Sequence, residues 1–277
     1  VFYLFPLYLD SFHPSKSQVG LIMGIHSVTA ILVRPLFGRV LDRRGGKRVA
    51  AAGVLIMAAS MPGFYFLESA GLLAVVLRAV NGIGWGVSTA ALLAICSEVA
   101  PADRMAQSLG FIGVAGIISQ AVGPAVAEEI FQRHSFDAVF TFSFLMLAAA
   151  LLCIVPIKET IQPSEHRRTA QARSALAFPF VILCIIAAMP TIHGAARGTV
   201  LNFIALYGAS LGFSRVGPFF LAFSVGAIIT RLGLGDFSDK YGRKRVIFPS
   251  AVLIGLNLFW IAGLNSYWAF IASGFIA

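Results

Sequence analysis

Charged and titratable side chains occur within long apolar stretches of this chain, where a charge is costly to bury. Arg78 and Asn81 lie in one such stretch, and His193 and Arg197 lie in another. A charge at the centre of a membrane helix costs roughly 2.5–3.5 kcal/mol on insertion scales, so it is expected to face a partner or water. An imidazole can change its protonation near neutral pH, which suits a proton site. These residues predict a polar path through an apolar protein.

The residues that we expect along this path are Arg78, Asn81, Trp85, Gln120, His26, His193, Arg197 and Asn202. The first three, together with Thr89, recur at helical spacing, which places them on one face of a helix. An alternative for Arg78 is a side chain that reaches the outer membrane interface. For the two histidines and Gln120, the alternative is hydrogen-bonded packing within the protein.

Carboxylates do not occur in the middle of these stretches. Glu128 and Glu129 lie near the end of one stretch, where we expect a solvated position at the rim of the membrane. No acid therefore balances the arginines of the path, and this imbalance favours an anionic or zwitterionic solute.

The composition is that of a membrane protein. Hydrophobic residues make up 58% of the chain and charged residues 12%, with a mean hydropathy of +0.86, whereas a soluble domain carries roughly 25% charged residues. The formal charge of +9 would suggest a nucleic-acid partner in a soluble protein, but here the basic residues fall almost wholly in short loops. Cys96, Cys153 and Cys184 lie inside apolar stretches without metal-ligand spacing. We therefore expect no nucleic acid, metal or cofactor.

Eight apolar stretches are long enough to cross a bilayer, which takes about 20 residues for about 30 Å of hydrocarbon. We predict membrane helices at 17–37, 49–67, 71–95, 106–130, 136–156, 178–207, 215–234 and 246–264. Residues 1–9 would end an earlier helix and residues 267–277 would begin a later one. The chain is therefore expected to be a fragment of a longer membrane protein.

Basic residues concentrate in alternate connections between these helices. One set of connections holds 14 Lys and Arg residues, and the other holds only Lys16, Arg133 and Arg215. Because basic loops stay on the cytoplasmic side, this asymmetry predicts the orientation of the chain. The polar segment 158–177 belongs to the basic side, and we interpret it as a cytoplasmic linker between two halves.

One short segment occurs twice. Arg34–Val49 reads RPLFGRVLDRRGGKRV, and Arg231–Val246, 197 positions later, reads RLGLGDFSDKYGRKRV, with seven of 16 residues identical. Both copies lie between two apolar stretches on the basic side. A duplicated basic hairpin in two hydrophobic halves is typical of a membrane transporter built from two repeats.

Both copies resemble the loop motif of the major facilitator superfamily, Gly-x-x-x-Asp-(Arg/Lys)-x-Gly-(Arg/Lys)-(Arg/Lys). The resemblance implies an all-α polytopic membrane fold of two pseudo-symmetric six-helix bundles, truncated here at both ends. It implies an N-terminal bundle at 1–157, from a partial helix 1 to helix 6. The cytoplasmic linker would occupy 158–177, and the C-terminal bundle 178–277, from helix 7 to a partial helix 10.

In that family the motif is implied to act as a conformational gate on the cytoplasmic side. The resemblance carries this role to Gly38, Asp42, Arg43, Gly45, Lys47, Glu98, Gly235, Asp239, Lys240, Gly242, Arg243 and Lys244. In the first copy, Gly38 would let a neighbouring helix approach closely, and Asp42 would favour the start of the next helix. Gly45 would allow a tight reversal of the chain.

The first copy departs from the pattern at Gly46, where the second copy has Arg243. The family's usual contact between this position and an acid at the end of helix 4 is therefore missing. We hypothesise that Lys47 or Arg48 pairs with Glu98 instead.

Two further segments resemble motifs of proton-coupled antiporters in the same family. The residues around Arg78 and Asn81 resemble the helix 4 motif, with Asn where Gln is usual. The stretch 106–130 resembles a degraded form of the exporter motif Gly-x-x-x-Gly-Pro-x-x-Gly, carried by Gly110, Ser119, Gly123, Pro124 and Ala127. These resemblances favour export over uptake.

The resemblance implies a secondary active transporter that moves a small organic solute by alternating access, as proton-coupled efflux. The expected partners are a small-molecule substrate, a proton and the lipid bilayer, with a monomer in a bacterial plasma (inner) membrane. The alternatives are an uptake symporter or facilitator of a small metabolite and, from another class, a transporter-like sensor that moves no solute. The sequence has no Walker loop, nucleophile–base arrangement or paired carboxylates, so we expect no enzyme.

Overall fold

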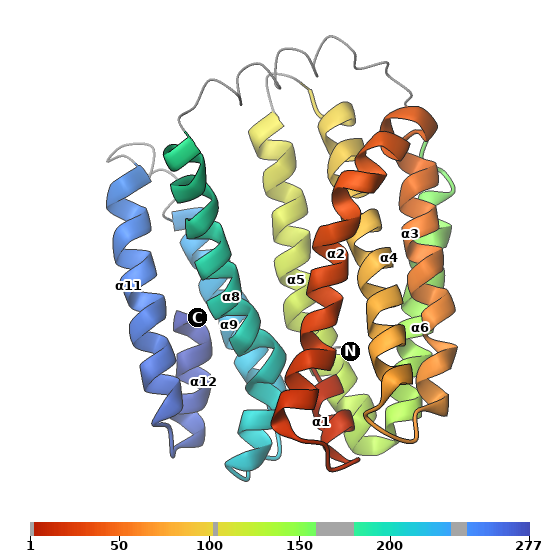
Figure 1. Ribbon diagram of the computed structural model, residues 1–277. Coiled ribbons are helices and arrows are strands. Elements are labelled where there is room, and N and C mark those ends of the chain that lie inside the picture. Colours follow the sequence, from red (N-terminus) through yellow and green to blue (C-terminus); the bar gives the residue numbers. More distant parts are fainter. Residues whose placement is uncertain (1–2, 102–104, 159–179, 234–242) are drawn as a thin grey trace. The chain divides into compact units, whose positions relative to one another are not determined.

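The structure is a computed structural model that describes residues 3–101, 105–158, 180–233 and 243–277. Within these ranges all regular structure is helical, as predicted. The helices are α1 (Phe5–Asp10), α2 (Lys16–Arg44), α3 (Gly46–Ser60), the 3-10 helix η1 (Pro62–Phe66), α4 (Leu72–Val99), α5 (Met105–Arg133), α6 (Phe136–Ile154), α8 (Phe180–Ser210), α9 (Gly217–Gly233), α11 (Arg243–Ala262) and α12 (Tyr267–Ile276) (Figure 1).

Each predicted membrane helix coincides with a helix of the structure. Five helical segments of the described residues are long and apolar enough to span a membrane: Lys16–Gly38, Gly46–Phe66, Leu72–Val99, Gly110–Arg133 and Phe136–Ile154. When α3 and η1 are taken as one span, the largest difference in a boundary is at the end of α2, which continues seven residues beyond the predicted end, to Arg44. Arg43 and Arg44 lie in its last turn, where cations are favoured by the helix dipole, so a polar extension of the helix is stable there.

Local residues set where two of these helices begin. At the start of α2, Ser15 accepts a hydrogen bond from the Gln18 amide while the Gln18 side chain accepts one from the Ser15 amide, at 3.3 and 2.9 Å. This capping box satisfies two of the amides that have no partner within the helix. Ser135 caps the start of α6 with a single hydrogen bond, which it accepts from the Ala138 amide.

The described residues group into two compact units, which we treat separately. Unit 1 comprises Val1–Leu4, Ile112–Gln132 and Leu176–Ala277, and unit 2 comprises Phe5–Phe111 and Arg133–Ala175. Most of α5 therefore packs with helices that follow the predicted linker. The linker at 158–177 lies outside the described residues beyond Lys158, and the predicted boundary between two bundles stays a prediction.

Close approach of helices through small residues holds unit 2 together. A Cβ added at Gly84 of α4 would lie 2.6 Å from the Gly53 carbonyl oxygen of α3, and one at Gly86 would lie 2.5 Å from the Ala30 carbonyl oxygen of α2. Glycines at these positions therefore allow α4 to pack against both neighbours, backbone on backbone. Such contacts drive helix association in membranes, where lipid removes much of the hydrophobic drive.

In unit 1, a glycine likewise allows close packing of α12 against α9, and a hydrogen bond joins α9 to α5. A Cβ added at Gly274 of α12 would lie 2.6 Å from the Phe219 carbonyl oxygen of α9, and the Phe219 and Phe270 rings are 5.3 Å apart. The buried Ser224 of α9 donates a hydrogen bond to the Ile117 carbonyl oxygen of α5 at 3.2 Å. These contacts fix the walls of the cavity described next.

Candidate functional site

A cavity of about 660 Å³ lies within unit 1, between α5, α8, α9, α11 and α12. Its size suits a small organic molecule, for which pockets usually hold 300–1,000 Å³. The polar side chains of its wall are Gln120, His193, Arg197, Thr230, Arg231 and Ser250. The rest of the wall is apolar and includes Ile117, Phe223, Leu253 and Ile254. The cavity therefore combines a large apolar surface with a few convergent polar groups.

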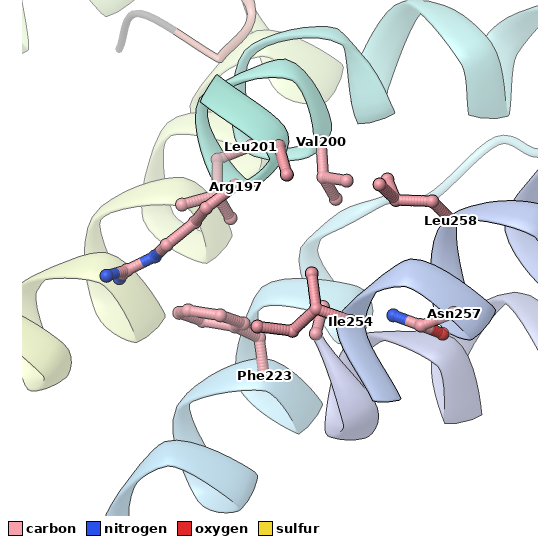
Figure 2. A pocket seen from close by; sticks show the side chains of 9 residues that line it. Arg197, Val200, Leu201, Phe223, Ile254, Asn257 and Leu258 are labelled. Atoms are coloured by element: carbon pink, nitrogen blue, oxygen red, sulfur yellow. The ribbon is translucent and has the colours of Figure 1, made fainter. Parts of the chain in front are cut away.

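Arg197 of α8 brings one guanidinium to this wall. Its Nη2 donates a hydrogen bond to Gln120 Oε1 of α5 at 2.9 Å, and its guanidinium carbon lies 5.1 Å from the centre of the Phe223 ring of α9. Figure 2 shows the side chain extending past Phe223, away from Asn257 and Leu258 of α11. A hydrogen bond and a cation–π contact thus hold the guanidinium in one place.

Arg231 brings a second guanidinium to the same helix. A Cβ added at Gly113 of α5 would collide with the Arg231 guanidinium, which therefore lies directly on the helix backbone there. Gly113 and Gln120 are seven residues apart, which is two turns of one face and about 10 Å at ~1.5 Å per residue. Arg197 and Arg231 therefore both contact the same face of α5.

His193 lies one turn before Arg197 on α8 and is exposed in the cavity wall. Asn202 is placed differently, because its side-chain amide donates to the Gly198 carbonyl oxygen of its own helix at 2.7 Å. The described lining residues contain no Asp or Glu. The fixed charge of the wall is consequently positive.

The remaining predicted path residues belong to unit 2. Arg78 is 1% exposed; its Nη2 lies 3.7 Å from Met23 Sδ, and its guanidinium carbon is 5.2 Å from the centre of the Phe5 ring. The buried Asn81 donates to Ser60 Oγ at 3.1 Å. Arg78 is thus packed inside the unit and does not reach outward to an interface.

Trp85 and His26 form a separate pair in unit 2. Their ring centres are 5.8 Å apart, and the Arg34 guanidinium carbon lies 5.9 Å from the Trp85 ring centre. Trp85 is 41% exposed, whereas Arg78 and Asn81 on the predicted shared face are buried. The structure therefore brings Gln120, His193 and Arg197 together, and it places Arg78, Asn81, His26 and Trp85 in another part of the chain.

The first copy of the repeated motif forms a sharp reversal. Gly45 has φ 85°, in the left-handed region that favours glycine, and it ends α2 and begins α3. This confirms the predicted turn at Gly45. Asp42 lies in the last turn of α2 rather than directly before α3, so its backbone does not occupy the capping position that we expected.

Gly46 and Lys47 explain how this copy departs from the family pattern. A Cβ added at Gly46 would lie 2.5 Å from Ile95 Cγ1 of α4, so a long side chain would not fit there. Lys47 Nζ donates to the Val155 carbonyl oxygen at 2.5 Å, at the end of α6, where a cation satisfies free carbonyls and the helix dipole. Glu98 is exposed at the end of α4, and its pairing with Lys47 or Arg48 stays a prediction.

The close approach expected at Gly38 does not occur within the described residues, because no atom lies within 4 Å of an added Cβ. In the second copy, Gly235, Asp239, Lys240 and Gly242 lie outside the described residues. Arg243 and Lys244 begin α11, and only their backbone is described. The gate role of both copies stays a prediction.

The residues of the predicted exporter motif in α5 differ in their packing, and the role of the motif in export stays a prediction. Ala127 is fully buried, and the Pro124 carbonyl oxygen accepts a hydrogen bond from the Tyr3 hydroxyl at 2.7 Å. An added Cβ at Gly110 or Gly123 would meet no atom within 4 Å among the described residues, so these two positions do not serve close packing there. Ser119 donates to the Ala115 carbonyl oxygen of its own helix.

Glu128 corrects one expectation. We predicted a solvated rim position, but the residue is 9% exposed, and its two carboxylate oxygens accept hydrogen bonds from the Val216 and Gly217 amides at 2.6 Å each. The start of α9 offers no capping side chain of its own at Val216 or Gly217, and the carboxylate of α5 supplies the missing acceptor. In the sequence, that absence indicates that the start of α9 needs an acceptor from elsewhere, but it does not identify Glu128 as that acceptor.

Comparisons with known proteins agree on the family. The Major Facilitator Superfamily model matches residues 1–277. The Multi-drug resistance efflux pump PmrA of Streptococcus pneumoniae serotype 4 is 26% identical over 260 residues, which cover 87% of this chain and 63% of that protein. The Multidrug resistance protein MdtG of Serratia proteamaculans is 24% identical over 285 residues, with 95% and 67% covered. The chain thus spans slightly less than two thirds of the length of PmrA.

A solved structure shares the fold. A crystal structure of a mutant of the peptide transporter POT in complex with alafosfalin has a TM-score of 0.67, with 15% identical residues, over 99% of this chain and 74% of that one. At this identity the likeness concerns the fold alone. It confirms the predicted all-α architecture with membrane-spanning helices.

Proposed function

Because the chain belongs to the Major Facilitator Superfamily, we propose that the protein is a secondary active transporter that exports a small organic solute in exchange for protons. It is an integral multi-pass membrane protein, and we place it in a bacterial plasma membrane as a monomer, with the repeated loops and the linker on the cytoplasmic side. The single observation that carries the proposal is the cavity of unit 1, whose wall holds Arg197 against Gln120 among apolar helices.

Contacts between helices on the two sides of the linker support alternating access. In unit 1, α5 precedes the linker, whereas α8 and α9 follow it. Four hydrogen-bonded contacts among the described residues join α5 to this later part of the chain: Glu128 with the start of α9, Ile117 with Ser224 of α9, Gln132 with Ser214 between α8 and α9, and Gln120 with Arg197 of α8. A rocking of one half against the other would break such contacts in one state and remake them in the next.

The names of the relatives support export. PmrA and MdtG are named as multidrug resistance proteins, and we carry the direction of transport to this chain as part of the proposal. Gln120, His193 and Arg197 are the residues to which we assign the solute path. Roles in transport for His26, Arg78, Asn81, Trp85 and Asn202 remain proposals that rest on the sequence pattern. We assign the protein no enzymatic reaction.

The alternatives are an uptake symporter or facilitator and a sensor that moves no solute. They differ from the proposal in the dependence of flux on a pH gradient. Export in exchange for protons requires that an acid interior drive solute into inside-out vesicles, a facilitator carries solute equally with and without the gradient, and a sensor carries none.

Flux in inside-out vesicles that contain the full-length protein tests the proposal. We expect a panel of labelled aromatic acids, amides and amines to include solutes that accumulate only when the vesicle interior is acid, and the accumulation to collapse when a protonophore removes the gradient. Vesicles without the protein provide the background. Accumulation that is independent of the pH gradient, or that requires the opposite pH gradient, would contradict proton-coupled export.

A further inference from the structure

Two arginines and no carboxylate among the described side chains give the unit 1 cavity one sign of charge. We propose that this cavity binds the anionic group of an amphipathic organic acid, with Arg197 as its principal anchor. This inference rests on the proposed function and names the class of solute at the same site.

Arg197 has donors left for a ligand. A guanidinium carries five N–H donors, of which Nη2 uses one on Gln120. Its Nε is buried and has no hydrogen-bond partner among the described residues. This enclosed atom does not face the cavity, but the remaining N–H groups of Nη1 and Nη2 can make charge-assisted hydrogen bonds to an oxyanion there.

The fixing of Arg197 makes it a good anchor. Gln120 holds it from α5, and the Phe223 ring lies beneath it. A flexible side chain would lose conformational freedom when it bound an anion. The Arg197 guanidinium is already held in place before an anion binds, so it would lose less. Planar geometry also lets it contact both oxygens of a carboxylate.

Arg231 extends the positive wall along α5. Its guanidinium lies on Gly113, about two turns from Gln120, or roughly 10 Å along the helix. One carboxylate would not reach both groups. Arg231 therefore adds attraction over a distance for a monoanion and a second contact for an elongated dianion, and we expect its loss to cost less than that of Arg197.

The apolar wall sets the rest of the ligand. Ile117, Phe223, Leu253 and Ile254 surround the polar groups with aliphatic and aromatic surface. A compact inorganic anion would leave this surface wet, whereas a fused-ring or branched hydrocarbon body would bury it at about 25 cal/mol per Å². A positively charged drug of the same shape would face two guanidinium groups and should bind poorly.

Binding of three matched ligands to the full-length protein in nanodiscs tests the inference. Naphthoate, naphthamide and naphthylmethylammonium share one ring system and differ in charge. We expect naphthoate to bind roughly 10- to 100-fold more tightly than naphthamide, as a charge-assisted hydrogen bond allows, and the cation most weakly. Equal or tighter binding of the amide or the cation, or failure of all three to bind, would overturn the assignment.

Variants test which residues produce the preference for naphthoate over naphthamide. Arg197→Gln should remove most of the preference for naphthoate over naphthamide, and Arg231→Gln should reduce it by a smaller factor. Arg197→Lys should retain part of it, because the charge remains while the planar contact is lost. Lys16→Gln, at an exposed position in unit 2, is the matched loss of a positive charge and should leave the ratio unchanged. An unchanged ratio in Arg197→Gln with an unchanged melting temperature would overturn the anchor role.

The outcome separates this inference from the proposed function. Flux that depends on a pH gradient but shows no preference for anions would leave the transporter intact and refute the anion site. Preferential binding of naphthoate without any flux would support the anion site and refute export.

Discussion

Arg78 and Arg197 look alike in the sequence, since each is an arginine within an apolar helix and each has an amide side chain or an imidazole nearby. Their surroundings differ. Arg78 is 1% exposed between Phe5 and Met23, in a unit whose helices touch through glycines. Arg197 is half-buried in the wall of a cavity, held by Gln120.

The comparison teaches that a charge within a membrane span does not by itself identify a ligand site. The neighbouring helices decide whether the side chain is enclosed or has room beside it. Where α4 meets α2 and α3 backbone to backbone, Arg78 is enclosed. Beside Arg197, residues of α5, α8 and α9 line a cavity of about 660 Å³.

Replacing each arginine by alanine should give the largest difference in stability between the two regions. Arg78→Ala removes a large, almost fully buried side chain and should destabilise the protein by about 2–5 kcal/mol. Arg197→Ala should change stability little, because its side chain borders open space. The melting temperature of each variant in detergent measures the difference. Arg78→Met, which keeps the volume, is the control; a greater loss of stability in Arg197→Ala than in Arg78→Ala would reverse the comparison.

Adding a small side chain at a tightly packed glycine should have the next largest effect. Gly84→Val would force a side chain against the Gly53 carbonyl oxygen and Met57 of α3 and should cost about 1–3 kcal/mol or more. Gly123→Val in α5 is the matched control, because an added Cβ meets no atom of the described residues within 4 Å there. Size-exclusion profiles and melting temperatures check both variants. Wild-type stability of Gly84→Val would show that unit 2 is less tightly packed than described.

Glu128 tests a contact inside unit 1. Glu128→Ala leaves the Val216 and Gly217 amides at the start of α9 without their acceptor and should cost about 1–3 kcal/mol. Glu128→Gln should cost less, since an amide oxygen can still accept one hydrogen bond. Glu68→Gln, at an exposed position of unit 2, is the control for loss of one carboxylate. If Glu128→Ala melts like the wild type, the carboxylate does not cap α9.

Substitution of Gln120 should have the smallest effect of the four sets of variants. Gln120→Ala removes the hydrogen bond that holds Arg197 and should weaken naphthoate binding by about 0.5–1.5 kcal/mol, or roughly 2- to 12-fold. Gln120→Glu should weaken it further, because a carboxylate would compete with the ligand for the guanidinium. Equilibrium binding in nanodiscs measures both. Tighter naphthoate binding in Gln120→Glu would contradict the proposed role of Arg197.

Most of the fold could be predicted from the sequence. Apolar stretches of about 20 residues located the helices, and Gly45 marked the reversal between α2 and α3 because few other residues adopt its φ. The extension of α2 to Arg44 was missed, since a polar helix end outside the membrane has the same composition as a loop.

The site could be predicted only in part. The residue types of Gln120, His193 and Arg197 identified them as path candidates, and the structure brings them into one cavity. The capping of α9 by Glu128 and the placement of Arg231 on Gly113 join residues about 88 and 118 positions apart. No local pattern records such pairs, because they depend on how the helices meet.

Cysteine protection by a ligand tests the central claim most directly, in a background where Cys96, Cys153 and Cys184 are replaced by serine. Thr230→Cys places a thiol in the wall of the unit 1 cavity, and Thr89→Cys places one on the helix face of Arg78. Both are labelled with a small maleimide in membranes, with and without naphthoate. We expect naphthoate to slow labelling of the Thr230→Cys variant only. Protection of the Thr89→Cys variant with none at position 230 would contradict the account.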